Sequence, residues 1–227
     1  MGNAARAVSS SSPSAKSLAR DASVVVRRIR PHVSLSAGVF VYVGYSGSEQ
    51  WLRILLLRRS IADHRIVEGV ALAWGAILDL EHADAGELAY ATALQLLATR
   101  EHSARELQAK LRRRRFSTEA ADAAVQRCIH KGALDERRFV ETVLRTAERK
   151  SHMSRARLCA KLRAAGVPEN VMQQAIEDAL VRDPTLFARA LQRAFERVGG
   201  ARASREVVTR RLLARGFEFK EITQLFA

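Results

Sequence analysis

Apolar residues recur at helical spacing through the chain from about residue 84 to the C-terminus. They stand three or four positions apart with charged residues between them, as in helices that bury one face and expose the other. Strand signals are nearly absent from this stretch. The pattern therefore predicts an all-α protein whose helical part spans residues 84–227.

The chain before residue 84 follows no single period. β-Branched and aromatic residues favour extended structure at Val24–Val26 and from Val33 to Gly47. The stretches Trp51–Arg59 and Val67–Leu80 look more helical. Because these pieces share no pattern, we expect residues 1–83 to form a poorly defined N-terminal extension that does not fold independently.

A run of serines lies near the N-terminus, from Ser9 to Ser12, and is followed by Pro13 and Ser14. Such a stretch has no apolar surface to bury, and it predicts disorder. We therefore expect the N-terminal extension to be partly disordered.

Three segments of the helical part align with one another without gaps. They begin at Ser103, Ser154 and Ser204, which lie 51 and 50 residues apart and belong to a residue type that caps helix N-termini. Each segment, with the helical stretch before it, predicts three helices. One unit of about fifty residues buries little surface, whereas stacked units gain interfaces with their neighbours. The alignment therefore predicts an elongated array of three tandem three-helix repeats. The repeats cover about residues 84–134, 135–182 and 183–227.

Aligned columns within the segments predict buried positions and a tight turn. In the turn column, Gly166 and Gly216 match Arg115. If this turn is left-handed, arginine costs about 1 kcal/mol relative to glycine. We therefore expect the first turn to be looser than the other two or shaped differently. The apolar columns expected to be buried are Leu107, Leu158 and Val208, followed by Leu111, Leu162 and Leu212.

The charge balance of the chain adds a candidate function. The chain has 38 Lys and Arg residues against 24 Asp and Glu residues, a net charge of +14. Residues 1–83 contribute +4 of this charge and residues 84–227 contribute +10. Such a basic surface attracts polyanions or an acidic protein partner.

Two features concentrate positive charge on the second helix of the predicted repeats. The basic column of Lys110, Lys161 and Arg211 lies beside the apolar stripe, where long side chains either lie along the core or reach a partner. The run Arg112–Arg115 cannot all face a core, so contact with a polyanion or an acidic partner is favoured over a solvated helix end. The candidate binding residues are Lys110, Arg112, Arg113, Arg114, Arg115, Arg155, Lys161, Arg163, Arg205, Arg210, Arg211 and Arg215.

Nothing in the sequence matches the motif of an enzyme, a metal site or a nucleotide-binding site. Cys128 and Cys159 suit packing within helices and cannot form a disulfide framework. The longest uncharged stretch, Pro31–Ser48, contains too many polar residues for a membrane span, and the N-terminus lacks the order of a signal peptide. We predict a cytoplasmic protein that is not an enzyme, requires no cofactor and does not enter a membrane.

Four motifs follow one another in the helical part: REHSARELQAKL, GALDERRFV, SRARLCAKLRAAGV and VVTRRLLARGF. They begin at Arg100, Gly132, Ser154 and Val207. In this order they resemble the RecX family, the regulatory proteins that modulate the RecA recombinase. The resemblance covers residues 84–227 and departs from the family's pattern at Arg115, where a turn glycine is usual.

The family resemblance implies both a fold and a function. The fold would be an elongated array of three-helix repeats. The protein would be a monomer that binds the RecA filament on single-stranded DNA, inhibits RecA and so regulates DNA repair, recombination and the SOS response. Its basic residues would meet DNA phosphates, acidic RecA surface or both.

An alternative from another class is a direct DNA-binding protein that uses its three-helix units as helix-turn-helix modules. The second helices differ at their exposed positions from one repeat to the next. No recognition surface recurs, and this disfavours the alternative.

Overall fold

The computed structural model describes residues 18–33, 35–45, 51–150 and 153–226. The chain divides into two compact units. The first consists of residues 1–95 and 111–127, and the second of residues 96–110 and 128–227. The serine run at Ser9–Ser12, for which we expected disorder, lies outside the described residues.

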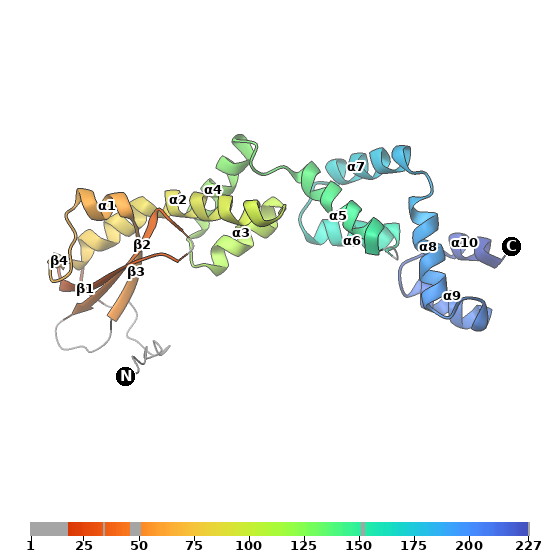
Figure 1. Cartoon of the computed structure of the whole chain (residues 1–227), viewed down its shortest axis with the longest axis horizontal. Helices are drawn as coiled ribbons and strands as arrows, with labels where there is room; N and C mark the ends of the chain where they lie inside the picture. Colours follow the sequence, from red (N-terminus) through yellow and green to blue (C-terminus); the bar gives the residue numbers. More distant parts are fainter. Residues whose placement is uncertain (1–17, 34, 46–50, 151–152, 227) are drawn as a thin grey trace. The chain divides into compact units, whose positions relative to one another are not determined.

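The first unit contains a four-stranded antiparallel sheet, in the strand order β3-β2-β1-β4 (Figure 1). The all-α prediction is therefore wrong for this part of the chain. The described residues before 84 form a defined fold, not a poorly defined extension. The strands are β1 (Ser23–Pro31), β2 (Gly38–Tyr45), β3 (Trp51–Leu57) and β4 (Ala71–Ala73).

Alternate burial explains why these residues form strands. Val24, Val41 and Ile54 lie on one face of the sheet and pack with Trp74 and Ile77 of helix α2 (Trp74–Thr99). Helix α1 (Arg58–Asp63) lies on the same side (Figure 1). A face that is buried in this way selects β-branched residues at every second position.

Two stretches that were expected to be more helical contain strands. The chain from Trp51 to Leu57 forms β3, and α1 begins only at Arg58. A short apolar run does not distinguish a strand from a buried helix by its period. Here the run is a strand because every residue of β3 pairs with β2. The stretch Val67–Leu80 likewise contains β4 before α2 begins, and α2 continues past residue 83 without a break.

Asp84 of α2 joins this helix to the end of the sheet. Asp84 is 4% exposed, and its carboxylate accepts hydrogen bonds from the Leu57 backbone N–H and the Ser60 hydroxyl, each at 2.7 Å. These bonds satisfy donors where β3 ends and α1 begins. The buried carboxylate therefore fixes α1 and β3 against α2.

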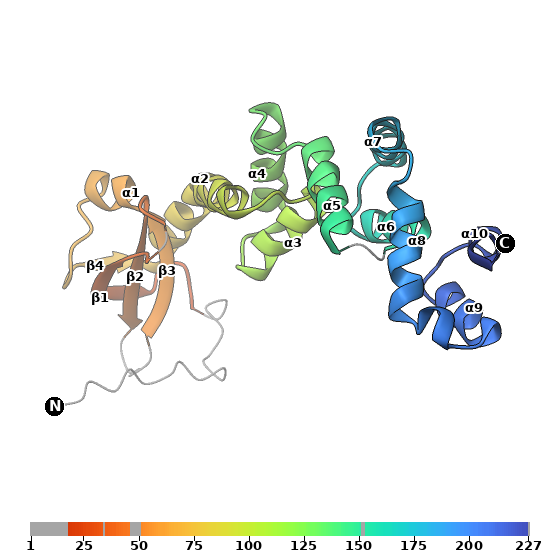
Figure 2. The ribbon, with the colours of Figure 1, turned by 45° about the vertical axis from the view of Figure 1, so that its right-hand side comes forward.

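After α2, the regular elements formed by the described residues are helices. Helices α3 (Ala104–Arg113) and α4 (Thr118–His130) come first. They are followed by α5 (Glu136–Lys150), α6 (Arg155–Ala164), α7 (Glu169–Arg182), α8 (Leu186–Arg197), α9 (Arg205–Leu213) and α10 (Phe219–Thr223). In the second unit, α5, α6 and α7 pack around Leu162 and Ile176, whereas α8, α9 and α10 pack around Leu212 and Ile222 (Figure 2).

The three aligned segments place matching residues in matching roles. Ser103, Ser154 and Ser204 each precede a helix, and each hydroxyl accepts a hydrogen bond from the backbone N–H three residues later. All six residues of the apolar columns are buried. The expected caps and the expected buried columns are both confirmed.

The turns after α3, α6 and α9 are also alike. Arg115, Gly166 and Gly216 have φ angles of 70°, 79° and 80°. The expectation of a looser or differently shaped first turn is therefore wrong, because Arg115 adopts the same left-handed conformation as the two glycines. In each turn the following N–H donates to the carbonyl of a leucine five residues earlier. These bonds join Phe116 to Leu111, Val167 to Leu162 and Phe217 to Leu212.

One hydrogen bond links each segment in the second unit to the next. The Ser103 hydroxyl donates to the Ala165 carbonyl at 2.6 Å, and the Ser154 hydroxyl donates to the Arg215 carbonyl at 3.0 Å. Ala165 and Arg215 occupy the same column of the alignment. Each of these serines therefore caps its own helix and also holds the turn of the following segment.

Candidate partner and nucleic-acid interface

The arginine run lies at the end of α3. Arg112 and Arg113 are in the last turn of the helix, and Arg114 and Arg115 form the turn that follows. All four are exposed, and none of the guanidinium groups has a hydrogen bond or ion pair among the described residues. A helix C-terminus favours cations, but four neighbouring charges exceed what the helix dipole can balance. The run is therefore a concentration of positive charge that is open to an anion.

The positive charge of Arg114 also affects the pKa of His32, which follows strand β1. Burial lowers the pKa of His32, and the positive charges of Arg114 and Arg53 lower it further. The arginine run therefore continues toward the sheet. The sequence-based list of binding residues contained none before residue 84, so it missed this extension. The signal was the alternation of arginine and isoleucine at Arg28–Arg30, which is typical of a strand with one charged face.

Helix α6 carries three of the predicted binding residues. Arg155 and Lys161 are exposed. Arg163 instead forms a bidentate pair with Glu169, with two N–O distances of 3.0 Å. The hydrogen bonds from Arg163 lower the pKa of the Glu169 carboxyl. The charge of Arg163 is therefore compensated within the chain, whereas Arg155 and Lys161 are available to a partner.

The three members of the basic column differ in their exposure and in their contacts. Lys110 is half-buried and Lys161 is exposed. Arg211 donates from Nη1 to the Val198 carbonyl at 2.7 Å, and Val198 is the residue that caps the C-terminus of α8. Arg211 therefore holds the end of a helix. Contact between Lys161 and a partner stays a prediction.

A shallow depression on α9 and the start of α10 is lined by Arg205, Glu206, Thr209, Arg210, Leu213 and Phe219. Leu213 is 45% exposed and Phe219 is 62% exposed. Exposed apolar side chains beside arginines are typical of surfaces that contact another protein. Arg215 differs from these residues, because its Nη1 atom is buried without a hydrogen-bond partner in the described part of the chain.

The REHSARE motif builds a buried polar cluster. The His102 side chain is fully buried, and its Nδ1 lies 3.1 Å from Oε2 of Glu106, which Arg100 also contacts at 3.0 Å. The Ala104 N–H donates to Oε1 of Glu136 at 2.8 Å. Nε2 of His102 and Oε2 of Glu136 are buried and have no hydrogen-bond partner among the described residues. This cluster fixes the start of α3.

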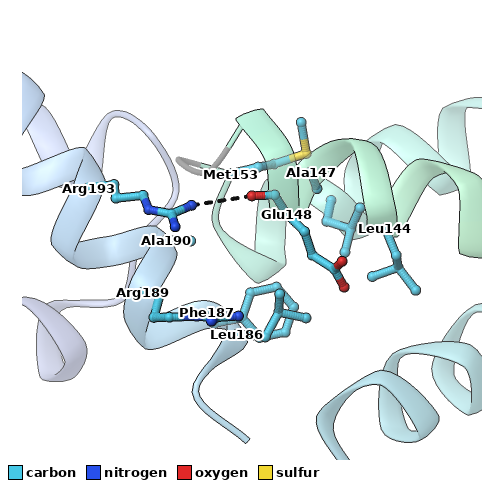
Figure 3. Close-up of a pocket in the computed structure, with 10 residues that line it drawn as sticks. Leu144, Ala147, Glu148, Met153, Leu186, Phe187, Arg189, Ala190 and Arg193 are labelled. Carbon is cyan, nitrogen blue, oxygen red and sulfur yellow. Dashed lines mark hydrogen bonds between the residues drawn. The ribbon is translucent and has the colours of Figure 1, made fainter. Parts of the chain in front are cut away.

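A small pocket of the second unit lies between α5, α6 and α8 (Figure 3). Leu144, Met153 and Phe187 line it, and Arg193 donates to the Glu148 carbonyl at 3.3 Å beside it. Its volume of about 20 Å³ has room for about one water molecule. The pocket is a gap in the packing and is too small for an organic substrate.

Metal-ligating clusters and membrane-spanning helices are absent from the described ranges. No group of three or more His, Cys, Asp or Glu side chains within them could hold a metal ion. Cys128 and Cys159 are buried, which confirms their expected packing role. No helix in the same ranges combines the length and the apolar character that a membrane span requires.

Known proteins are similar to this chain over more than half of its length. A family model described as "RecX, first three-helix domain" matches residues 89–128. The regulatory protein RecX of Pseudomonas putida is 34% identical over 141 residues, which are 60% of this chain and 87% of that protein. The chain belongs to the RecX family. A second RecX, the regulatory protein of Pelodictyon phaeoclathratiforme, is 30% identical over 135 residues, or 57% of this chain and 81% of that relative.

The fold of this RecX family member also matches a solved structure. A crystal structure of regulatory protein RecX gives a TM-score of 0.58 at 14% identity, and the match covers 89% of this chain and 98% of the other. At this identity the match shows a common fold. Residues 84–227 are too few to supply 89% of the chain, so the match includes part of the region before residue 84, for which the sequence alone showed no counterpart.

Proposed function

We propose that this RecX family member is a non-enzymatic regulator that binds the RecA filament on single-stranded DNA and inhibits RecA. It would thereby regulate recombination, DNA repair and the SOS response. The observation that carries the proposal is the 34% identity with the regulatory protein RecX of Pseudomonas putida, because that match spans 87% of the relative. A match of this length involves more than one helical module.

The proposed architecture of the helical part is an array of three tandem repeats, α2–α4, α5–α7 and α8–α10. The recurring serine-to-carbonyl bonds, Ser103 to Ala165 and Ser154 to Arg215, support it. Identical links between successive units are the basis of repeat proteins. A RecA filament presents the same surface once per subunit, and an array of like units suits such a partner. The protein would act as a monomer in the cytoplasm.

Two surfaces suit the two components of a protein–DNA filament. The run Arg112–Arg115 is exposed and unpaired among the described residues, which suits contact with phosphates. The depression bordered by Arg205 and Arg210 adds the exposed apolar side chains Leu213 and Phe219. This mixture suits an acidic protein surface better than a DNA backbone.

The helix-turn-helix alternative has less support. Such modules need a second helix whose polar side chains are free to enter a DNA groove. On α6, Arg163 is paired with Glu169, and on α9, Arg211 is bonded to the Val198 carbonyl. The second helices therefore do not offer equivalent recognition surfaces.

Replacement of Arg112–Arg115 by alanine tests the filament proposal. Binding of the full chain to a preformed RecA filament on labelled single-stranded DNA should weaken. The salt dependence should become shallower by about 0.7 log unit for each single-strand phosphate that the variant no longer neutralises. A matched control removes the same charge from exposed positions of the second unit. The control residues are Arg145, Arg182, Arg197 and Arg202.

The control separates the outcomes of this experiment. We expect a larger loss of affinity in the Arg112–Arg115 variant than in the control. Unchanged affinity and salt slope would remove the run from the interface. A wild-type chain that binds free DNA as tightly as the filament would contradict the proposal and favour the direct DNA-binding alternative.

A further inference from the structure

The face of the sheet opposite α2 carries cationic and aromatic side chains that the proposed function does not use. Residues directly opposite one another in antiparallel strands point to the same side of a sheet. The pairing of β1, β2 and β3 therefore aligns side chains in rows across this face. One row is Arg30, Phe40 and Leu55, and the next is Arg28, Tyr42 and Arg53. Leu55 packs against an apolar cluster that includes Leu88 of α2, so the open part of the face consists of the other side chains.

Arg27 reaches the same face through an irregularity of β1. The register of β1 against β2 shifts between Val26 and Arg28. The Arg27 side chain then lies over Gly44, with its Nε 3.0 Å from the place that a Cβ of Gly44 would occupy. Gly44 lies two positions after Tyr42 and shares its face. Glycine at this position leaves the room that the arginine occupies.

No acidic residue of β1, β2 or β3 balances the positive charge of this face. Strands β1, β2 and β3 contain four arginines and no Asp or Glu. Arg27, Arg28, Arg30 and Arg53 are exposed, and none has an ion pair in the described part of the chain. The charge continues at Arg114, which acts on His32 together with Arg53. The face therefore attracts a polyanion.

Aromatic rings lie among these arginines. The Phe40 ring centroid is 4.8 Å from the His32 ring centroid and 4.8 Å from the central guanidinium carbon of Arg53. Tyr42 is half-buried, and Trp51, opposite Gly44 at the start of β3, is 44% exposed. Unpaired nucleobases stack on aromatic rings and on guanidinium planes.

From this arrangement we infer that the open face of the sheet binds single-stranded nucleic acid. The arginines contact backbone phosphates, and Tyr42 and Trp51 stack on bases. A duplex fits less well, because its bases are already stacked on one another. An acidic protein surface would pair with the arginines, but it would not account for the aromatic rings that lie among them. The site lies on elements other than α6 and α9, and it requires no RecA.

Fluorescence anisotropy of a labelled oligothymidylate tests the site with the full chain and without RecA. Trp51→Ala should weaken binding about fivefold or more, because one base–aromatic stack is removed. The double variant Arg28→Ala/Arg53→Ala should lower the salt slope by about 0.7 for each phosphate that it no longer neutralises. The matched control, Arg197→Ala/Arg202→Ala, removes the same charge from the second unit and should leave most of the affinity.

Tryptophan fluorescence gives a second readout on the unmodified chain. The chain has two tryptophans, of which Trp74 is 1% exposed and Trp51 is 44% exposed. Oligothymidylate should quench the Trp51 emission. In Trp51→Phe, which retains an aromatic ring, the quenching should disappear while the far-ultraviolet circular dichroism stays unchanged.

Three results would overturn the inference. They are unchanged affinity in Trp51→Ala, equal weakening in the double variant and its control, and equal competition by a DNA duplex of the same length. Because RecA is absent, loss of the sheet site leaves the filament proposal standing. Failure of the chain to bind RecA filaments would likewise leave the sheet site standing.

Discussion

Arg115 adopts a left-handed backbone conformation, and the two matching positions in the other segments have the same conformation but are glycines. Its φ of 70° compares with 79° at Gly166 and 80° at Gly216. A Cβ makes this conformation cost about 1 kcal/mol. The exposed side chain has no hydrogen bond or ion pair within the described residues to offset the strain. A strained arginine whose side chain has no partner within the described residues is consistent with a role in contacting another molecule.

Arg115→Gly should therefore raise the free energy of unfolding by about 1 kcal/mol, because glycine adopts the left-handed conformation without steric cost. Urea denaturation of both proteins measures the difference. Arg115→Ala is the control, since it removes the charge but keeps the Cβ. No gain in the glycine variant, or an equal gain in both variants, would show that the turn is not strained.

Buried His102 makes the stability of the chain depend on pH. Burial lowers its pKa from the ordinary 6.5, and the hydrogen bond with Glu106 opposes this only in part. The unfolded chain then binds the proton more readily than the folded chain. The contribution of neutral His102 is therefore complete above pH 6.5 and is lost as the pH falls toward the lower pKa of the folded state.

His102→Gln should reduce this loss, because glutamine does not titrate. We expect the wild-type chain to lose more stability than the variant between about pH 7.5 and about pH 5.5. Urea denaturation at the two pH values measures both losses, and Glu136, whose pKa is raised by burial, titrates in both proteins. An equal loss in the two proteins would contradict the assignment to His102.

At the scale of elements, the helices of the second unit were easier to predict than the sheet. Their caps, such as Ser154, and their buried columns, such as Leu162, follow from residues close in sequence. Strand β3 was assigned wrongly because the run beginning at Trp51 has apolar residues at almost every position. Its state is decided by pairing with β2, an interaction between distant residues that a local pattern does not contain.

Comparison of Ser154→Ala with Ser204→Ala tests the link between segments. Both variants lose an N-cap, which costs about 1 kcal/mol. Only Ser154 also donates to a carbonyl of the next segment, at Arg215. Ser154→Ala should therefore lower the free energy of unfolding by about 1 kcal/mol more than Ser204→Ala. Equal losses in urea denaturation would mean that the link contributes nothing to the array.

At the scale of the whole molecule, the sequence predicted where positive charge lies but not which charges are free. The side chains of Arg112–Arg115, Arg155, Arg163 and Arg211 are all exposed. Arg163 and Arg211 have partners within the chain, whereas Arg112–Arg115 and Arg155 have none among the described residues. Those partners come from neighbouring elements, and their contacts depend on packing that helical spacing alone does not specify. The arginines of the sheet were missed for the same reason, since their common face exists only once the strands pair.

The molecule therefore has cationic surfaces on both its sheet and its helices. Net charge alone would make it a general DNA-binding protein. Membership of the RecX family, together with the partly apolar surface at Leu213 and Phe219, supports a protein–DNA filament as the partner. A general DNA-binding protein would inhibit RecA only by occupying free DNA, whereas a filament regulator would inhibit RecA without doing so.

Titration of RecA ATPase activity on single-stranded DNA distinguishes these views most directly. The same titration is followed for binding of this chain to the DNA alone. A filament regulator should inhibit at concentrations where little free DNA is bound. Inhibition that begins only when the free DNA is saturated would contradict the filament proposal, because competition for DNA would then explain the whole effect.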